Sequence, residues 1–358
     1  MKDFNLNLES KSESRSSKVP SSHPPIAKSK VGILIANLGT PDATNYWAVR
    51  RYLSEFLSDR RVIDYTPWIW QLILQIIILT RRPFSSGAAY RSIWNSEKNE
   101  SPLLTHVRDQ AEKIRVNLTK IFGEKIVVEF CMRYGNPPTK KTIYKMKEEG
   151  CNRIIFLPMY PQYSAATTGT ANDEAFRALM NLNWQPSIRT VPSYFDNPEY
   201  IKCLANSVLE KYRELNEKPE HLVVSYHGVP ERYLLAGDPY HCHCQKTSRL
   251  LKETLGWSND QLSTTFQSKF GPGKWLGPAT VDYVSELARN GKKRIAVVAP
   301  AFSSDCIETL EEIKEEIRES FLEAGGEQFT YIDCLNSRDD HIKFLCNLII
   351  NEAKGWLE

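Results

Sequence analysis

Short apolar runs alternate with longer amphipathic stretches along most of this sequence. The apolar runs cover residues 31–37, 126–130, 153–157, 222–225 and 294–298. Runs of this kind are typical of parallel strands that are buried on both faces. The stretches between them have the length of helices, for example 105–122, 199–216 and 309–324. This alternation predicts an α/β protein with doubly wound parallel sheets, one in each of two domains.

Residues 1–30 differ in composition from the rest of the chain. They are rich in Ser, Lys and Pro and offer almost nothing to bury, which predicts a disordered tail. Asp3, Glu9 and Glu13 argue against a transit peptide, and no apolar core of a secretory signal is present. The 358 residues exceed one ordinary hydrophobic core, so two domains are expected.

Charge and cysteine content narrow the class of protein. The 46 basic and 43 acidic residues give a net charge of +3, which does not favour a nucleic-acid partner. The 8 cysteines are sparse for a disulfide scaffold, and reduced thiols are the better interpretation. We therefore expect a soluble cytoplasmic enzyme.

In doubly wound sheets the ligand binds at the carboxyl ends of the strands, so the loops there carry the candidate chemistry. They show no dinucleotide fingerprint, no Walker motif and no paired Cys-x-x-Cys set. Instead they carry aromatic and polar side chains, among them Arg133, Tyr134, Tyr160, Tyr163, His227, Asp305 and Glu308. Such a set suits a flat, apolar ligand and a divalent metal.

Five segments together resemble the ferrochelatase family, whose members insert ferrous iron into a porphyrin. They are Tyr160-Pro-Gln-Tyr163 with Thr167-Thr-Gly169, Ser225-Tyr-His-Gly-Val-Pro230 with Gly237-Asp-Pro-Tyr240, Gln267-Ser-Lys269 with Gly271-Pro272, Trp275-Leu-Gly-Pro278, and Asp305-Cys-Ile-Glu-Thr-Leu310. The resemblance implies two similar Rossmann-like domains, each a parallel sheet flanked by helices, around a porphyrin cleft. Residues 31–162 plus 336–358 would form the first domain with a lip over the cleft. Residues 163–335 would form the second, with the metal site.

The resemblance implies that His227 and Glu308 are the catalytic and metal-binding residues. Taken alone, His227 would more often be a structural histidine, and Glu308 part of a solvated acidic helix. A neutral imidazole at His227 could accept a pyrrole proton or bind iron, and the sequence leaves both roles open. Asp305 and Glu312 match further acidic positions that would pass iron inward or protons outward. Cys306 stands where mammalian members have His, and we interpret it as a buried thiol.

The porphyrin-binding residues implied by the resemblance are Arg81, Arg82, Tyr90, Arg133, Tyr134, Tyr160, Tyr163, Thr167 and Trp275. The most apolar segment, residues 67–80, is too short to span a bilayer. On its own it is consistent with a buried core helix, whereas the resemblance implies the mobile lip. As a lip, residues 67–82 would also dock on a membrane surface, and Arg81 and Arg82 would meet porphyrin propionates.

The segment His241-Cys-His-Cys244 looks like a metal-binding tract. Some ferrochelatases hold a [2Fe–2S] cluster through three C-terminal cysteines and one after Tyr-Pro-Gln-Tyr-Ser, a position that is Ala165 here. Because the chain also ends at Glu358 without that extension, we expect no such cluster. Ligation through Cys242 and Cys244 is the alternative, and a polar helix start is the simpler interpretation.

These observations predict a ferrochelatase, a lyase without a prosthetic group. It would insert Fe²⁺ into protoporphyrin IX, release two protons and form protohaem, the last step of haem biosynthesis. Two alternatives stay open: a chelatase for another metal or tetrapyrrole, such as a coproporphyrin, and a haem or porphyrin carrier without turnover. We expect a cytoplasmic location with peripheral membrane contact.

Overall fold

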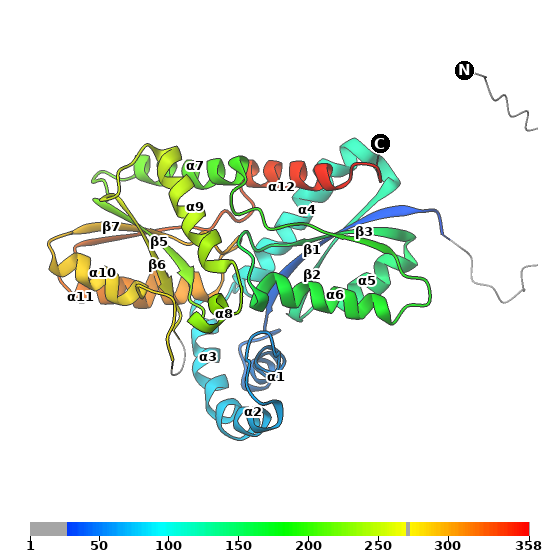
Figure 1. Cartoon of the computed structure of the whole chain (residues 1–358), viewed down its shortest axis with the longest axis horizontal. Coiled ribbons are helices and arrows are strands. Elements are labelled where there is room, and N and C mark those ends of the chain that lie inside the picture. The colour runs from blue at the N-terminus through cyan, green and yellow to red at the C-terminus, as the bar shows by residue number, and fades with distance from the viewer. Residues whose placement is uncertain (1–26, 270–272, 358) are drawn as a thin grey trace, which may run out of the picture.

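The computed structural model describes residues 27–269 and 273–357, and its two four-stranded parallel sheets lie side by side (Figure 1). The first sheet has the order β2 (Ile126–Gly135), β1 (Lys30–Thr40), β3 (Cys151–Pro158), β4 (Ser187–Thr190). The second has the order β6 (Leu262–Gln267), β5 (His221–His227), β7 (Arg294–Val298), β8 (Gln328–Ile332). The predicted pair of parallel sheets flanked by helices is confirmed. The predicted tail lies outside the described residues up to position 26.

Helices flank the sheets, and three of them project as an arm (Figure 1). The arm consists of α1 (Tyr46–Leu57), α2 (Pro67–Ile73) and α3 (Leu79–Ile93), with η1 (Leu74–Ile78) between the last two. The remaining helices before the second sheet are α4 (Pro102–Phe122), η2 (Gly123–Lys125), α5 (Thr139–Glu148), η3 (Ala165–Gly169), α6 (Thr170–Met180) and α7 (Pro198–Glu214). The later ones are α8 (Glu231–Leu235), α9 (Tyr240–Leu255), α10 (Thr280–Arg289), η4 (Glu308–Ile317), α11 (Arg318–Glu323) and α12 (Asp339–Glu352).

Local capping explains why α4 begins earlier than the sequence pattern predicted. Apolar periodicity suggested a start at residue 105, but the Ser101 hydroxyl accepts a hydrogen bond from the Leu104 amide at 3.2 Å. Pro102 occupies the first helical position, where its missing N–H has no cost. Capping chemistry therefore decides this boundary.

Three short segments are π-helical: η1 in the arm, η3 after Ser164, and η4, which opens the predicted helix at 309–324 one residue early. π-Helical turns are rare and occur often at functional sites. All three lie in segments to which the family resemblance assigns substrate or metal contacts. The π-helical turns therefore coincide with the segments where substrate or metal contacts are predicted.

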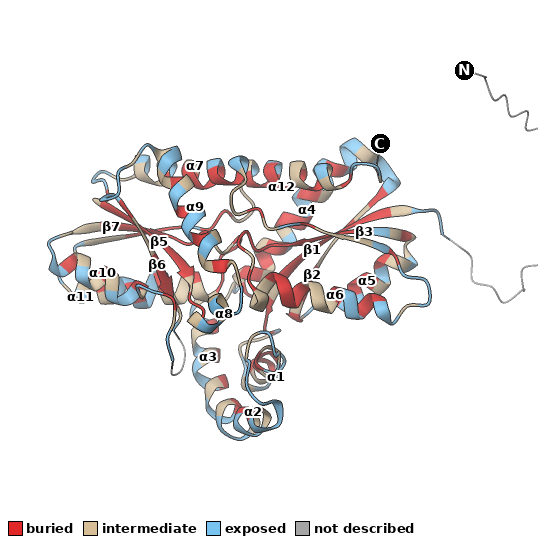
Figure 2. Cartoon of the chain, in the orientation of Figure 1, coloured by how far each residue is buried: buried red, intermediate tan, exposed pale blue. Residues whose placement is uncertain are grey.

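One hydrophobic cluster spans the two sheets, and the pairing of β4 corrects the predicted domain boundary. A single buried cluster contains Ile33 and Ile155 of the first sheet and Val224 and Val298 of the second, covered by α7 and α12 (Figure 2). Residues 163–190 were assigned to the second domain, but β4 pairs with β3, so this segment completes the first sheet. The chain therefore enters the second unit only after β4.

Burial of His341, in the first turn of α12, makes the stability of the fold depend on pH. Burial lowers the pKa of His341 to about 4, although its Nδ1 lies 2.8 Å from the Asn336 carbonyl oxygen. An unfolded histidine titrates near ~6.5, so between these values the unfolded chain takes up a proton that the folded chain does not. The free energy of unfolding therefore falls as the pH falls through this window.

Between pH 7 and 4.5 the free energy of unfolding of the wild type should fall. In His341→Gln, which has no titrating group at this position, that fall should be smaller by about 2–3 kcal/mol. Chemical denaturation of both proteins at the two pH values measures this difference. An identical loss of stability in wild type and variant would contradict the prediction.

Candidate active site

His227 is the last residue of β5, and its backbone surroundings fix it closely. The Gly228 amide donates to the Gln267 carbonyl oxygen at 2.7 Å, and a Cβ at position 228 would lie only 2.6 Å from that oxygen. The His227 Nδ1 lies 2.7 Å from the Gly228 carbonyl oxygen. Because a carbonyl oxygen can only accept, Nδ1 carries a proton, so in the neutral imidazole Nε2 presents the lone pair. Nε2 is therefore suited to accept a proton or to bind a metal.

Glu308 is the first residue of η4, and its carboxylate lies among buried, uncharged groups. Burial raises the pKa of the Tyr52 and Tyr90 hydroxyls, and the negative charge of Glu308 raises both further. Burial and the same charge raise the pKa of the Cys306 thiol. Among the described residues, no lysine or arginine forms an ion pair with Glu308. A carboxylate in this setting is suited to bind a divalent cation.

Gln267 connects the His227 strand with the Glu308 helix. It lies opposite His227 in the ladder between β5 and β6. Its Nε2 donates to the Glu308 carbonyl oxygen at 2.8 Å and to Glu312 Oε2 at 3.0 Å. Its Oε1 accepts a hydrogen bond from the Ser225 hydroxyl at 2.9 Å. Gln267 therefore holds the first turn of η4 against the end of β5. The sequence analysis did not predict this role, and the only signal for it was the place of Gln267 in a family motif.

The two further acidic positions lie in different settings. Glu312 is half-buried and also accepts the Ser268 amide at 2.7 Å. Asp305 is only 3% exposed, and its carboxylate accepts hydrogen bonds of 2.5, 2.9 and 2.6 Å from Tyr331, Thr309 and Asn336. These contacts hold the turn before η4. Asp305 is therefore a buried anchor of that turn, and its place on a path for iron or protons stays a prediction.

A cavity of about 480 Å³ lies between the arm and the loop that follows His227. Apolar and aromatic side chains dominate its lining, which consists of Val62, Ile63, Tyr65, Thr66, Ile69, Trp70, Ile73, Ile78, Pro230, Arg232 and Trp275. The Leu276 amide donates to the Val229 carbonyl oxygen at 3.0 Å, so the Trp275 loop is fixed to the loop after His227. The volume and lining of this cavity are typical of sites for small apolar ligands. Of the predicted porphyrin contacts, Trp275 lines it.

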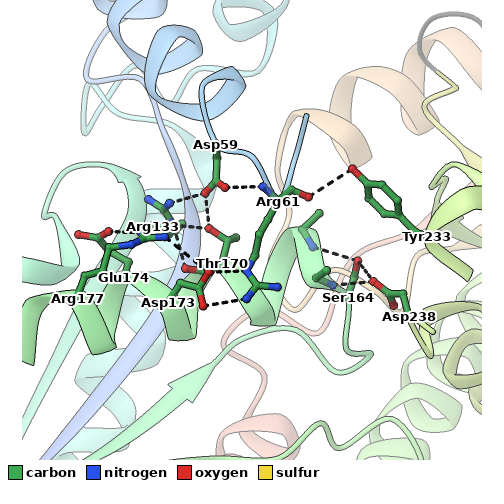
Figure 3. Close-up of polar contacts among 12 residues, drawn as sticks. Asp59, Arg61, Arg133, Ser164, Thr170, Asp173, Glu174, Arg177, Tyr233 and Asp238 are labelled. Carbon is green, nitrogen blue, oxygen red and sulfur yellow. Dashed lines mark hydrogen bonds and ion pairs between the residues drawn. The ribbon is translucent and has the colours of Figure 1, made fainter. Parts of the chain in front are cut away.

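Arg133 and Tyr134 were predicted to contact porphyrin, but both bind Asp59 (Figure 3 shows Arg133 and Asp59). Asp59 also accepts hydrogen bonds from the Thr170 hydroxyl and, at 2.8 Å, from the Arg61 amide. Burial opposes ionisation of Asp59, but these hydrogen bonds and the charge of Arg133 lower its pKa overall. Tyr134 has no exposed surface. Tyr134 packs in the hydrophobic cluster of the arm, and its contact with porphyrin stays a prediction.

The other predicted porphyrin contacts differ in how far they are buried, and none lines the cavity between the arm and the loop after His227. Tyr90 and Tyr160 are buried, each in a hydrophobic cluster. Tyr163 and Thr167 are half-buried. On α3, Arg81 is exposed, whereas Arg82 is half-buried and burial lowers its pKa. Their predicted roles therefore require a ligand that reaches beyond this cavity.

The second unit holds the segment of Tyr163 in place. Asp238 accepts the Ala165 amide at 2.7 Å and the Ser164 hydroxyl at 3.2 Å (Figure 3). His243 Nδ1 accepts the Tyr163 amide at 3.2 Å, and its ring stacks on Phe195. His243 therefore positions a loop.

The described residues contain no group of three or more His, Cys, Asp or Glu side chains able to hold a metal ion, in the tract at 241–244 or elsewhere.

The lip, defined as residues 67–82, combines buried and exposed apolar side chains. Trp70, Leu74 and Leu79 are buried, and the Trp70 indole donates to the Leu57 carbonyl oxygen at 2.6 Å. Much of α2 is exposed (Figure 2), and the exposed apolar side chains of the lip are Trp68, Ile69, Leu72, Ile73, Ile76 and Ile77. Within the described part of the chain, no helix has the length and apolar character needed to cross a membrane.

Solved structures with a similar fold define the class. The chain matches SirB from Bacillus subtilis, solved with Fe³⁺, with a TM-score of 0.53 and 12% identity, over 91% of this chain and 97% of that chain. A multi-domain protein from Deinococcus radiodurans, described as structurally similar to chelatases, matches with a TM-score of 0.50 and 8% identity, over 92% of this chain and 56% of that one. This protein therefore has the chelatase fold.

Sequence comparison then identifies the family. The ferrochelatase family model matches residues 30–353. The ferrochelatase of Rhodobacter capsulatus is 58% identical over 340 residues, which cover 95% of this chain and 97% of the relative. That of Agrobacterium fabrum is 50% identical over 341 residues, covering 95% and 98%. The chain belongs to the ferrochelatase family of metal chelatases.

Proposed function

We propose that this protein inserts Fe²⁺ into protoporphyrin IX, so that protohaem forms and two protons are released. The observation that carries the proposal is that two reactive side chains, His227 and Glu308, lie on elements that are bonded to each other. The Nε2 lone pair of His227 and the carboxylate of Glu308, which has no cationic partner among the described residues, belong to elements joined by Gln267. An apolar cavity lies at the loop that follows His227. The reaction itself is inferred from membership of the ferrochelatase family.

The chemistry follows from the shape of the substrates. A flat porphyrin directs its nitrogen lone pairs into a hole too small for hydrated Fe²⁺. A bent ring exposes those lone pairs on one face, and a rigid site can hold that geometry. In our proposal Glu308 takes the place of water on the iron, and His227 accepts pyrrole protons as Fe–N bonds replace N–H bonds. A carrier would need neither group.

Steady-state formation of haem from Fe²⁺ and protoporphyrin IX tests the proposal, and absorbance of the product follows it. Binding of protoporphyrin without turnover would indicate a carrier. A higher kcat/KM with a four-carboxylate coproporphyrin than with protoporphyrin would indicate the other substrate. We also propose that no [2Fe–2S] cluster is present, because Ala165 replaces a cluster cysteine; iron–sulfur absorption in the purified protein would contradict this.

We also propose that the lip docks on a membrane surface, where an apolar porphyrin can be collected. Leu72 and Ile76 are 55% and 66% exposed, and Trp68 beside them suits the boundary between lipid and water. Replacing both Leu72 and Ile76 by Ser should weaken sedimentation with phosphatidylcholine–phosphatidylglycerol vesicles and leave the melting temperature nearly unchanged. Because Arg81 would face anionic headgroups, added salt should weaken binding of the wild type.

Leu79 provides the matched control for this prediction. Its side chain is completely buried, so Leu79→Ser should lower the free energy of unfolding by about 2–5 kcal/mol. Unchanged vesicle binding of the Leu72 and Ile76 double variant would show that these side chains do not form the docking surface.

A further inference from the structure

The cavity beneath the lip has a single charged side chain in its lining, Arg232. Arg232 lies in α8, a few residues after His227, on the side of the cavity that faces the lip. Its guanidinium carbon is 5.6 Å from the centre of the Tyr65 ring and 5.3 Å from that of Tyr233. Within the described ranges it forms no ion pair with a carboxylate. This cation is therefore held by aromatic faces and available to an anionic group.

The backbone that carries Arg232 is fixed to both walls of the cavity. The Glu231 amide donates to the Lys274 carbonyl oxygen at 2.9 Å, which ties α8 to the Trp275 loop. The Tyr233 hydroxyl donates to the Val62 carbonyl oxygen at 3.0 Å, which ties α8 to the segment that leads into the lip. Arg232 is an exposed residue that also lines the cavity. A ligand lying in the cavity would therefore meet this cation at a defined place.

We propose that Arg232 binds one carboxylate of the tetrapyrrole substrate and thereby orients the ring in the cavity; this inference rests on the proposed function. A carboxylate brought to an apolar cavity loses hydration and needs a compensating partner. A guanidinium matches a carboxylate with two parallel hydrogen bonds. The cavity lining contains no acidic side chain that would compete. Arg81 and Arg82, to which the sequence assigned this task, lie outside that lining.

Fluorescence titration with protoporphyrin IX and with its dimethyl ester, in the same detergent, tests this role. The ester has the same ring but no carboxylate. Arg232→Gln should weaken binding of the free acid about tenfold, the scale of a partly exposed charged hydrogen bond, and change binding of the ester less than about twofold. Arg232→Lys should recover part of the loss. Arg249→Gln on α9, where Arg249 pairs with Glu253 outside the cavity, should change neither.

The outcomes separate this inference from the function on which it rests. Equal weakening of acid and ester would mean that Arg232 only holds the lip through Tyr65, which overturns the inference. Unchanged binding of both compounds overturns it as well. If wild type forms haem while either result is obtained, the proposed function stands and only the role of Arg232 is refuted. A folded wild type that neither binds protoporphyrin nor forms haem would refute both.

Discussion

His227→Ala is expected to lower the rate of iron insertion by at least ~10²-fold, the usual scale for loss of a general base. The variant loses the Nε2 lone pair, and Ala fits the last position of β5 without disturbing the ladder with β6. Porphyrin binding should persist, because the cavity lining does not include His227. Initial rates with Fe²⁺ and protoporphyrin IX, together with quenching of protein fluorescence by porphyrin, measure the two effects separately.

His241→Ala is the matched control, because His241 lies in the tract at 241–244 on α9. It should keep near wild-type turnover. Turnover near wild type in His227→Ala would rule out His227 as proton acceptor and iron ligand alike. A large loss in His241→Ala would instead restore a metal-handling role for that tract.

Glu308→Gln should also reduce turnover by about 10²-fold or more, because it removes a charge and leaves the shape of the side chain. The Gln267 contact to the Glu308 backbone is kept, so η4 should remain in place. The melting temperature should therefore change little while the rate falls. Initial rates over a range of Fe²⁺ concentrations measure the loss and show how much of it is iron binding.

Glu319→Gln is the control on the same acidic segment, in the exposed part of α11. A solvated carboxylate contributes little, so this variant should retain its activity. Equal small effects of Glu308→Gln and Glu319→Gln would mean that Glu308 belongs to a solvated acidic face. The contrast between the two positions therefore decides the role of Glu308.

The sequence pattern located β1, β3, β5 and β7, which are interior strands, and also the edge strand β2. The interior strands are largely apolar because helices cover both faces of each parallel sheet. β4, β6 and β8 were not predicted, and all three are edge strands. They carry polar residues such as Ser187, Thr264 and Gln328, which an edge strand tolerates because one side lacks a neighbour. The domain boundary was misplaced for the same reason, since β4 was not recognised.

Family motifs in the sequence determined the class of reaction and the positions of His227 and Glu308. Their chemical setting depends on contacts between segments far apart in the chain, which only the tertiary structure decided. Packing made Asp305 an anchor, buried Tyr134 behind Asp59 and brought Gln267 between the two reactive residues.

The lip shows the same division between sequence and structure. Its apolar composition is plain in the sequence, but a run of aliphatic residues does not reveal which side chains face inward. The fold buries Leu79 and exposes Ile76, and it places Arg232 of the second unit in a cavity lining that also contains Ile69 and Ile73 of the lip. Residue type and order therefore determined the apolar strands and the family, whereas burial and charge pairing at the site arise from packing across the two units, which no local pattern encodes.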